Sequence, residues 1–322
     1  MPGRPTLQAL ILALAFGLAG TGEPATTQPP PPPEVVRYDL RSALDGQIRA
    51  HGNIHWRIGI AVFSCSRDSL LYDSGASQPL RPASCQKLLV TSYAIEHWDS
   101  SLVRALDLHL DSTNLTSHLH RVNRKLVDSL GLNARPDFPG YRHLVLADRE
   151  SDNTEAEWML DFLSRRYGID GPRLLDAFLD QRGVTRPGMK LCDACGLSQH
   201  NRLTAATLAK LLVTDYQSKW RDLFISTLAV PGRPGTLIKR NLDVGPHLAA
   251  KTGYIRGVFC LSGFLFGQTD TYAFSFIVND CGSGTRAYEL FNGLLDTIYS
   301  WKSSEADVPI VGRRFDPGAV QN

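Results

Sequence analysis

The chain has 322 residues, of which 43% are hydrophobic and 20% are charged, a composition typical of a folded globular protein. Its 34 Lys and Arg residues against 32 Asp and Glu residues give a formal net charge of +2. The sequence therefore lacks the basic excess with which nucleic-acid-binding proteins attract their partner, and we expect no nucleic-acid partner.

The first 25 residues have the layout of a secretory signal peptide. Arg4 precedes an apolar run from Leu7 to about Ala19, and small residues follow. The run is short for a membrane-spanning helix, although an uncleaved anchor remains the alternative. Residues 26–33 form a proline-rich linker that favours extended polyproline structure. We therefore expect an exported, periplasmic protein with no stable membrane span after cleavage, and a single folded domain over residues 34–322.

Periodicity predicts the elements that follow the linker. Residues 34–50 are amphipathic with a helical period, and residues 56–65 and 69–75 predict two strands joined by a short polar turn. A helix is predicted to begin after Pro82, because proline suits the first turn of a helix. Residues 99–150 are mixed and predict only short helices and loops.

The rest of the chain changes from a helical to a strand period. Helices are predicted over residues 154–168, 171–183 and 203–216, and again over 285–301 at the C-terminal end. Residues 249–267 and 271–280 predict strands on either side of a Gly-Gln-Thr-Asp turn. This order predicts an α/β chain of the α+β type, in which an antiparallel sheet from the N- and C-terminal segments carries an inserted all-helical subdomain.

Cysteine usage bears on redox state and on metal binding. The six cysteines of an exported chain could form up to three disulfides, and we expect at least one among Cys65, Cys85, Cys192, Cys195, Cys260 and Cys281. Cys192 and Cys195 form a CxxC motif, but a zinc site needs a second pair of ligands, and none follows at a suitable spacing. We therefore expect no metal and no cofactor.

Ser84 and Lys87 form an SxxK motif at the start of an otherwise apolar helix. Residues three apart share one face of a helix, so the lysine amine can reach the serine oxygen. A buried lysine loses its proton more readily than an exposed one and can then serve as a base. Because an SxxK spacing arises by chance about once in a chain of this size, a lysine stem lying along apolar surface is the alternative interpretation.

Two further triplets make a chance match improbable. Ser151-Asp152-Asn153 lies between the mixed region and the next predicted helix, and Lys251-Thr252-Gly253 opens a predicted strand. Taken singly, the first could be a helix cap and the second an ordinary strand start. Taken together and in this order, the three motifs indicate one active site.

With SxxK, S-D-N and K-T-G in this order, the sequence resembles the penicillin-interacting serine enzymes. More narrowly, it is similar to the D-alanyl-D-alanine carboxypeptidase/endopeptidase family that includes penicillin-binding protein 4. That similarity lies in the segments PASCQKLL, SDNTEAEWML, CGLSQHNRLT, PGRPGTLIKR and AAKTGYIRGVFCLSGFL. The resemblance implies a β-lactamase/transpeptidase-like fold, peptidoglycan stem peptides ending in D-Ala-D-Ala as substrates, and β-lactam antibiotics as covalent inhibitors.

The resemblance also implies a role for each motif residue. Ser84 would attack the carbonyl between two D-alanines, Lys87 would take its proton, and Ser151 would relay a proton to the leaving amine. The substrate-binding residues would be Asn153, Lys251, Thr252, Gly253 and Tyr254. Among these, the backbone N–H of Tyr254 would share the oxyanion hole with that of Ser84.

The sequence departs from this family in several places. Only residues 88–150 separate the first two motifs, so the large insertion usual in the family is missing. Tyr254 stands where Ser or Thr is common and would narrow the cleft, and Cys85 follows the nucleophile directly. A serine β-lactamase or esterase of the same fold remains the main alternative, although Glu155 and Glu157 offer no convincing counterpart of a deacylating glutamate. A non-catalytic wall-binding protein is the other alternative.

Overall fold

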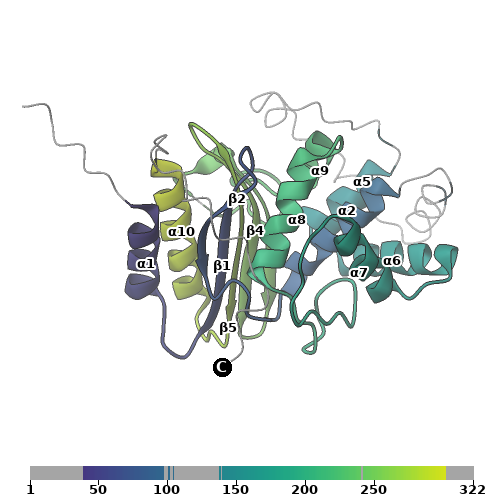
Figure 1. Cartoon of the computed structure of the whole chain (residues 1–322), viewed down its shortest axis with the longest axis horizontal. Coiled ribbons are helices and arrows are strands. Elements are labelled where there is room, and N and C mark those ends of the chain that lie inside the picture. The colour runs from purple at the N-terminus through teal and green to yellow at the C-terminus, as the bar shows by residue number, and fades with distance from the viewer. Residues whose placement is uncertain are drawn as a thin grey trace, which may run out of the picture. The chain divides into compact units, whose positions relative to one another are not determined.

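A five-stranded antiparallel sheet in the order β2-β1-β5-β4-β3 lies between two layers of helices (Figure 1). Its strands are β1 (Arg57–Ser64), β2 (Ser69–Ser74), β3 (Leu248–Ile255), β4 (Val258–Phe266) and β5 (Thr271–Asn279). The N-terminal hairpin and the C-terminal strands join where β1 pairs with β5. The expected antiparallel sheet from both ends of the chain is therefore confirmed.

The computed structural model describes residues 39–97, 101, 104, 138, 140–240 and 242–301. These residues belong to one compact unit, Tyr38–Asn322. The expected signal peptide, the expected linker and most of the mixed region lie outside the described residues. In the part that is described, no helix has both the length and the apolar character to cross a membrane.

The prediction of one continuous strand over residues 249–267 is wrong. The chain reverses at Arg256 and Gly257, which separates β3 from β4 and pairs them as a hairpin. Gly257 has a φ of 77°, a left-handed conformation that glycine adopts without steric cost, and an apolar run by itself does not reveal such a reversal. The reversal leaves β3 as an edge strand, which matters because β3 carries the K-T-G motif.

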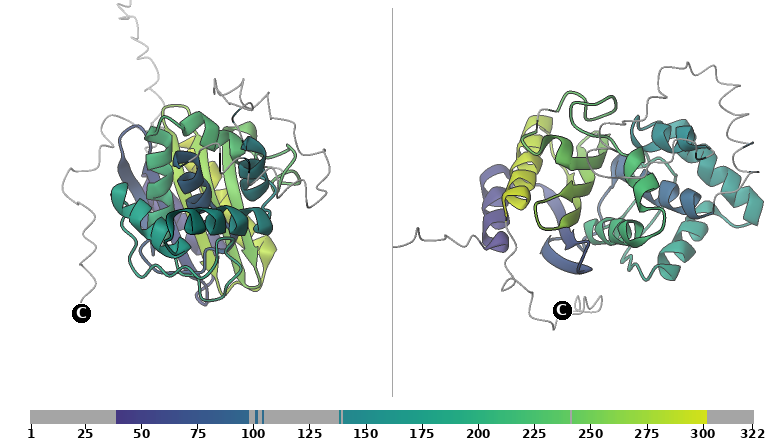
Figure 2. Two further views of the ribbon diagram at one scale, coloured as in Figure 1. Left: turned by 90° about the vertical axis from the view of Figure 1, so that its right-hand side faces the viewer. Right: turned by 90° about the horizontal axis from the view of Figure 1, so that it is seen from above.

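Helices cover both faces of the sheet (Figures 1 and 2). One face packs against α1 and α10, and the other packs against α8, with the remaining helices on the same side of the sheet. The helices are α1 (Leu40–His51), α2 (Lys87–Glu96), α5 (Tyr141–Asp148), α6 (Asn153–Tyr167), α7 (Gly171–Gln181), α8 (Ala205–Gln217), α9 (Arg221–Thr227) and α10 (Gly284–Ser300). The short 3₁₀ turns η1 (Ala83–Gln86) and η3 (Gly245–His247) complete the described elements.

Alternation along the strands creates two cores, one on each face of the sheet. In β1, Ile60 and Val62 join the core beneath α1 and α10, whereas Ala61 joins the core beneath the helical layer. This is the period of two expected of a strand buried on both faces. The helical layer supplies most of the second core, and the S-x-x-K segment runs through it.

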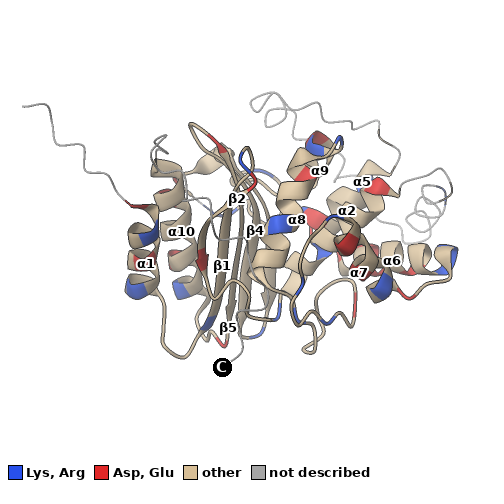
Figure 3. Ribbon diagram, in the orientation of Figure 1, with Lys and Arg blue, Asp and Glu red and all other residues tan. Residues whose placement is uncertain are grey.

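Charged residues of both signs are mixed over the outer helices, as the ribbon coloured by charge shows (Figure 3). On α6, for example, Asp161 and Arg165 form an exposed ion pair one turn apart. The described surface therefore carries interspersed charge, in keeping with the small net charge of the sequence.

Candidate active site

Ser84 lies in the 3₁₀ turn η1, one turn before α2 begins at Lys87. The sequence predicted one helix carrying both residues. Instead, Ala83 has a φ of 45°, which is outside the helical region, and Ser84 follows it in the 3₁₀ turn. A non-glycine residue with a positive φ is strained, and such strain collects at functional sites. The side chain of Ser84 is 8% exposed, so the turn places it at the edge of the core rather than inside it.

Two glycines pack against this turn so closely that a side chain would not fit. A Cβ on Gly196 would lie 1.9 Å from the carbonyl oxygen of Ala83. A Cβ on Gly253 would lie 3.1 Å from the backbone nitrogen of Cys85. The segments that follow the CxxC motif and that form β3 therefore approach the serine turn from two sides and fix its position.

Lys87 connects three parts of the site through its amine. Its Nζ donates to the Oγ of Ser84 at 2.9 Å, to the Oδ1 of Asn153 at 2.8 Å and to the carbonyl oxygen of Cys195 at 3.0 Å. The sequence predicted the first two contacts, while the third comes from the loop after the CxxC motif. Lys87 is fully buried, and burial lowers its pKa.

Ser151 and Lys251 form a second pair beside the first. The Nζ of Lys251 donates to the Oγ of Ser151 at 2.8 Å and to the carbonyl oxygen of Thr252 at 2.9 Å. Ser151 is held with a φ of 63°, and the next residue, Asp152, caps α6 by accepting from the backbone N–H of Glu155. Burial, followed by the charge of Lys87, lowers the pKa of Lys251 to about 8.

Tyr254 occupies a different place from the one expected. Residues two apart on a strand share a face, so Lys251 and Gly253 face the helical layer and Tyr254 faces the other side. There the Tyr254 ring lies 5.1 Å from that of Phe259, which in turn lies 5.7 Å from that of Tyr288 on α10. Tyr254 is 62% exposed. Its side chain therefore offers no support for the expected narrowing of the cleft.

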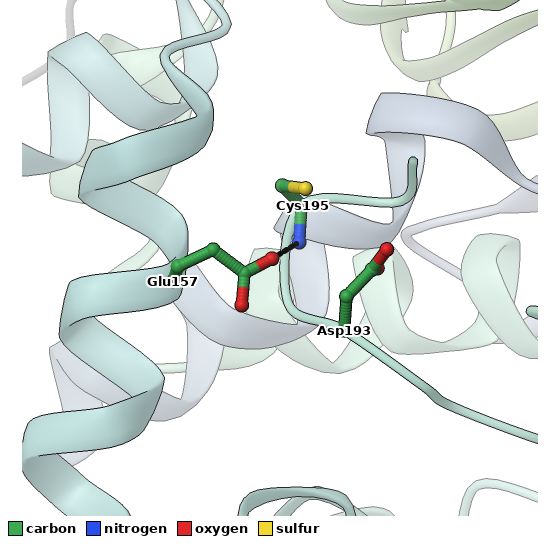
Figure 4. Close-up of side chains that lie close together, drawn as sticks. All are labelled: Glu157, Asp193 and Cys195. Carbon is green, nitrogen blue, oxygen red and sulfur yellow. Dashed lines mark hydrogen bonds between the residues drawn. The ribbon is translucent and has the colours of Figure 1, made fainter. Parts of the chain in front are cut away.

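A loop held by two carboxylates presents the carbonyl of Cys195 to Lys87. Glu157 on α6 accepts from the backbone N–H groups of Ala194 and Cys195, each at 2.9 Å (Figure 4). Asp193 accepts from the N–H groups of Gly196 and Ser198 within the same loop. Glu157, Asp193 and Cys195 bring their ligand atoms within 4.8 Å of one another, but both carboxylates already accept from this loop, so the trio serves as a brace.

The expectation of at least one disulfide is wrong, because all six cysteines are free thiols. In the CxxC motif the two side chains diverge, since Cys192 is exposed and Cys195 is buried. Cys85 and Cys260 are both buried, and their thiol groups interact with each other. The Sγ of Cys85 also donates to the carbonyl oxygen of Lys251, 3.3 Å away, so this residue packs the serine turn onto β3.

Sequence reasoning missed several polar residues that shape the site. Glu157 was considered only as a candidate for deacylation, and Asp193 was passed over although it lies between the two cysteines. The Nε2 of Gln86, inside the S-x-x-K motif, donates to Asp193. Gln86 could have been found from the sequence, because it is a polar residue in an otherwise apolar segment. The burial of Asp148, discussed below, left no signal in the sequence.

Comparisons with known proteins agree with the motifs and the fold. Residues 144–292 match the model of the D-Ala-D-Ala carboxypeptidase 3 (S13) family, and this segment includes Ser151, Asn153 and Lys251. A D-alanyl-D-alanine carboxypeptidase of Actinomadura sp. (strain R39) is 37% identical over 146 residues, which cover 43% of this chain and 26% of the relative. Carboxypeptidase DacB of Mycolicibacterium smegmatis is 28% identical over 232 residues, which cover 67% of this chain and 48% of the relative. The matches thus span less than half the length of these relatives.

Solved structures show the same fold at low sequence identity. Penicillin-binding protein 4 (dacB) from Haemophilus influenzae, in complex with a β-lactam, has a TM-score of 0.62 at 13% identity, covering 80% of this chain and 99% of that chain. A class A β-lactamase from Clostridium kluyveri has a TM-score of 0.52 at 15% identity, covering 80% of this chain and 98% of that chain. The family resemblance seen in the motifs is therefore confirmed, and the chain is related, through residues 144–292, to the D-Ala-D-Ala carboxypeptidase 3 (S13) family.

Proposed function

We propose that this protein is a serine-type D-Ala-D-Ala carboxypeptidase that acts on peptidoglycan stem peptides through an acyl-enzyme on Ser84. The observation that carries the proposal is the convergence of three motifs far apart in the sequence on two lysine amines. Lys87 reaches Ser84 and Asn153, and Lys251 reaches Ser151. A nucleophile, a buried amine base and a second hydroxyl beside a second amine are the groups that acyl transfer without histidine requires.

The first step follows from the contact between Lys87 and Ser84. With its pKa lowered by burial, Lys87 can be unprotonated, and the 2.9 Å separation lets it take the proton of the Ser84 hydroxyl. The serine oxygen then attacks the carbonyl carbon of the penultimate D-alanine. The peptide C–N bond breaks, and Ser151, hydrogen-bonded to Lys251, passes a proton to the departing amine. Water later cleaves the ester and regenerates the serine.

The open edge of β3 supports the proposed oxyanion hole. Ala250 exchanges two backbone hydrogen bonds with Ala229, so its N–H and C=O point away from β4. Because backbone groups alternate along a strand, the N–H of Tyr254, four residues on, points to the same side. This donor and the N–H of Ser84 would stabilise the oxyanion, while Lys251 and Thr252 would receive the terminal carboxylate of the substrate.

The two glutamates after the S-D-N motif favour a peptidase over a β-lactamase. Glu157 is engaged by the backbone of the CxxC loop, and Glu155 is buried with one oxygen 2.9 Å from the Nδ1 of His143. Neither carboxylate is placed to activate a water for rapid deacylation. A β-lactam would therefore form a long-lived acyl-enzyme, and we propose such antibiotics as covalent inhibitors. Endopeptidase action on cross-linked stem peptides and a location on the exported side of the membrane belong to the same proposal.

Labelling with a fluorescent penicillin tests the nucleophile. We expect the unmodified protein to be labelled for many minutes and Ser84→Ala not to be labelled at all. Ser69→Ala is a matched control on β2, at the far edge of the sheet, and should be labelled like the unmodified protein. Absence of label on the unmodified protein would refute the assignment of Ser84, and loss of label within seconds would favour a β-lactamase.

Release of D-alanine tests the substrate. A stem pentapeptide ending in D-Ala-D-Ala should lose one D-alanine per peptide in the presence of the unmodified protein and none with Ser84→Ala. Covalent labelling without release of D-alanine, and without cleavage of cross-linked muropeptides, would support a non-catalytic wall-binding protein instead.

A further inference from the structure

Asp148 is a fully buried carboxylate that interacts electrostatically with the two lysines of the site. It ends α5, three residues before Ser151. Its Oδ1 accepts from the hydroxyl of Thr91 at 3.1 Å, and its Oδ2 accepts from the hydroxyl of Thr227 at 2.9 Å. Thr91 follows Lys87 by one turn of α2, so the residue that binds the carboxylate shares a helix face with the lysine. Both hydrogen-bond partners are uncharged.

The two lysines of the site act on the charge of Asp148, and the next residue, Arg149, is also buried but donates to the carbonyl of Ser226. Lys251 comes from β3 and Lys87 from α2, and each interacts favourably with the carboxylate. Burial raises the pKa of Asp148 to about 6, which leaves the group charged at neutral pH. α9 contributes only the hydroxyl of Thr227 to this carboxylate.

Other groups also face the lysines. Around Lys87 these are Cys195 from the loop, Cys85 from η1 and Asp152 before α6, and around Lys251 they are Lys87 and Cys85. Cys195 keeps its proton at neutral pH, because burial raises its pKa to about 12. Asp152 already accepts from the first turn of α6. Asp148 is thus the buried carboxylate that interacts with both amines.

We propose that Asp148 is a positioning residue for the reaction, an internal counter-ion that sets the protonation balance between Lys87 and Lys251. This inference rests on the proposed function, because it assigns those lysines as base and carboxylate receptor. Two neighbouring ammonium groups in a buried site repel each other. This repulsion lowers the pKa of both, so one of them loses its proton more readily. A negative charge behind both allows Lys251 to stay an ammonium ion while Lys87 becomes an amine.

The variant Asp148→Asn tests the charge of this side chain without changing its size. The amide has the size of the carboxylate, and its oxygen can accept from one threonine. The Thr227 hydroxyl can turn its one proton to the carbonyl of Phe224, which is also within hydrogen-bond distance, and accept from the amide nitrogen. The variant therefore keeps the packing and removes only the charge. Asp215→Asn is the matched control, because Asp215 is also buried and hydrogen-bonded, to Ser92 and Arg182, away from the lysines.

The pH dependence of acylation by a fluorescent penicillin is the first readout. Without the counter-ion both lysines lose their protons at lower pH, so both limbs of the pH–rate profile should move about one pH unit in the acid direction. The Asp215→Asn profile should keep the position of the unmodified one. An Asp148→Asn profile that also keeps that position would overturn the inference, whatever its height.

Titration of the lysine side chains by ¹³C NMR is the second readout and needs no turnover. In Asp148→Asn the midpoints for Lys87 and Lys251 should fall relative to those of the unmodified protein and of Asp215→Asn. Unchanged midpoints would refute the counter-ion role. Absence of labelling in the unmodified protein would refute the proposed function alone, since the NMR titration would still decide the role of Asp148.

Discussion

The two ends of α2 lie beside charged groups that are arranged in opposite ways. At its C-terminal end, Arg182 pairs with Glu96 and, at 2.5 Å, with Asp215, so each charge meets its opposite directly. At its N-terminal end, Lys87 and Lys251 are fully buried, and their hydrogen-bond partners are hydroxyl, amide and carbonyl oxygens.

This difference separates a structural cluster, made of Glu96, Arg182 and Asp215, from a reactive cluster, made of Lys87, Lys251 and their hydrogen-bond partners. Burial opposes the charge of Arg182, yet Asp215 and Glu96 raise its pKa, and this ion pair joins α2, α7 and α8. Burial also raises the pKa of Asp215, to about 7, although Arg182 opposes that shift. At the other end burial lowers the pKa of both lysines, which brings them towards the neutral form. Ionisable groups that are buried without a direct ion pair are costly to fold and are typical of sites that exchange protons.

Lys87→Met should have the largest effect on activity of the variants considered, with no loss of stability. Methionine keeps the length of the side chain but leaves Ser84 without a base, so we expect acylation by a fluorescent penicillin to fall by about 10³-fold or more. Because the change also removes a buried charge, the melting temperature should stay level or rise. A folded Lys87→Met protein that is labelled at the unmodified rate would refute the assignment of Lys87 as base.

Arg182→Met should have the reverse effect. It leaves Asp215 buried beside Ser92 alone, and breaking a buried ion pair from one side costs about 3–5 kcal/mol of unfolding free energy. Urea denaturation measures this loss, while the labelling rate of the protein that remains folded should not change. Arg182→Met combined with Asp215→Leu removes both charges and should recover much of the stability. A double variant as unstable as the single one would contradict the ion-pair explanation.

The pH dependence of stability tests the buried charge of Asp148. Burial raises the pKa of Asp148 from 3.8 to about 6, so the folded state binds this proton more tightly than the unfolded state does. The stabilisation is fully present below pH 4 and is lost as pH rises to about 6. By linkage the loss is about 3 kcal/mol. Asp148→Asn should remove this dependence, so its unfolding free energy should exceed that of the unmodified protein at pH 8 and match it near pH 4. Equal differences at both pH values would contradict the buried charge.

The reactive cluster was more predictable from the sequence than the structural support around it. Ser84, Lys87, Ser151 and Lys251 lie in motifs whose order is informative, and the contact between Ser84 and Lys87 is the one that the spacing predicted. The strand and helix periods likewise predicted the antiparallel sheet and the inserted helical subdomain. The turn at Gly257 escaped prediction, because apolar residues on both sides hide a reversal that depends on one positive φ.

The residues that were missed act through tertiary contacts that no local pattern encodes. Asp148 resembles any polar residue at the end of a helix until α2 and α9 close over it. The brace formed by Asp193 and Glu157 likewise needs α6 to meet a loop some forty residues further along the chain. Cys85, odd in the sequence, is explained by its contacts with Lys251 and Cys260 on the neighbouring strands.

Glu157→Ala should have the smallest effect on the rate of acylation. It tests whether the reactive cluster includes the carboxylate that holds the CxxC loop. Without this carboxylate, the N–H groups of Ala194 and Cys195 lose their acceptor, and the Cys195 carbonyl that receives Lys87 is free to shift. A small displacement of the base should slow acylation by about 10-fold, with little change in unfolding free energy, because the residue is exposed.

Glu157→Gln should restore most of the rate, since the amide oxygen can still accept from the loop. Asp161→Ala, one turn further along α6, removes only an exposed ion pair with Arg165 and should leave the labelling rate unchanged. If Glu157→Ala is labelled as fast as Asp161→Ala, the Cys195 carbonyl does not need the brace, and the reactive cluster ends at the lysines, their direct partners and Asp148.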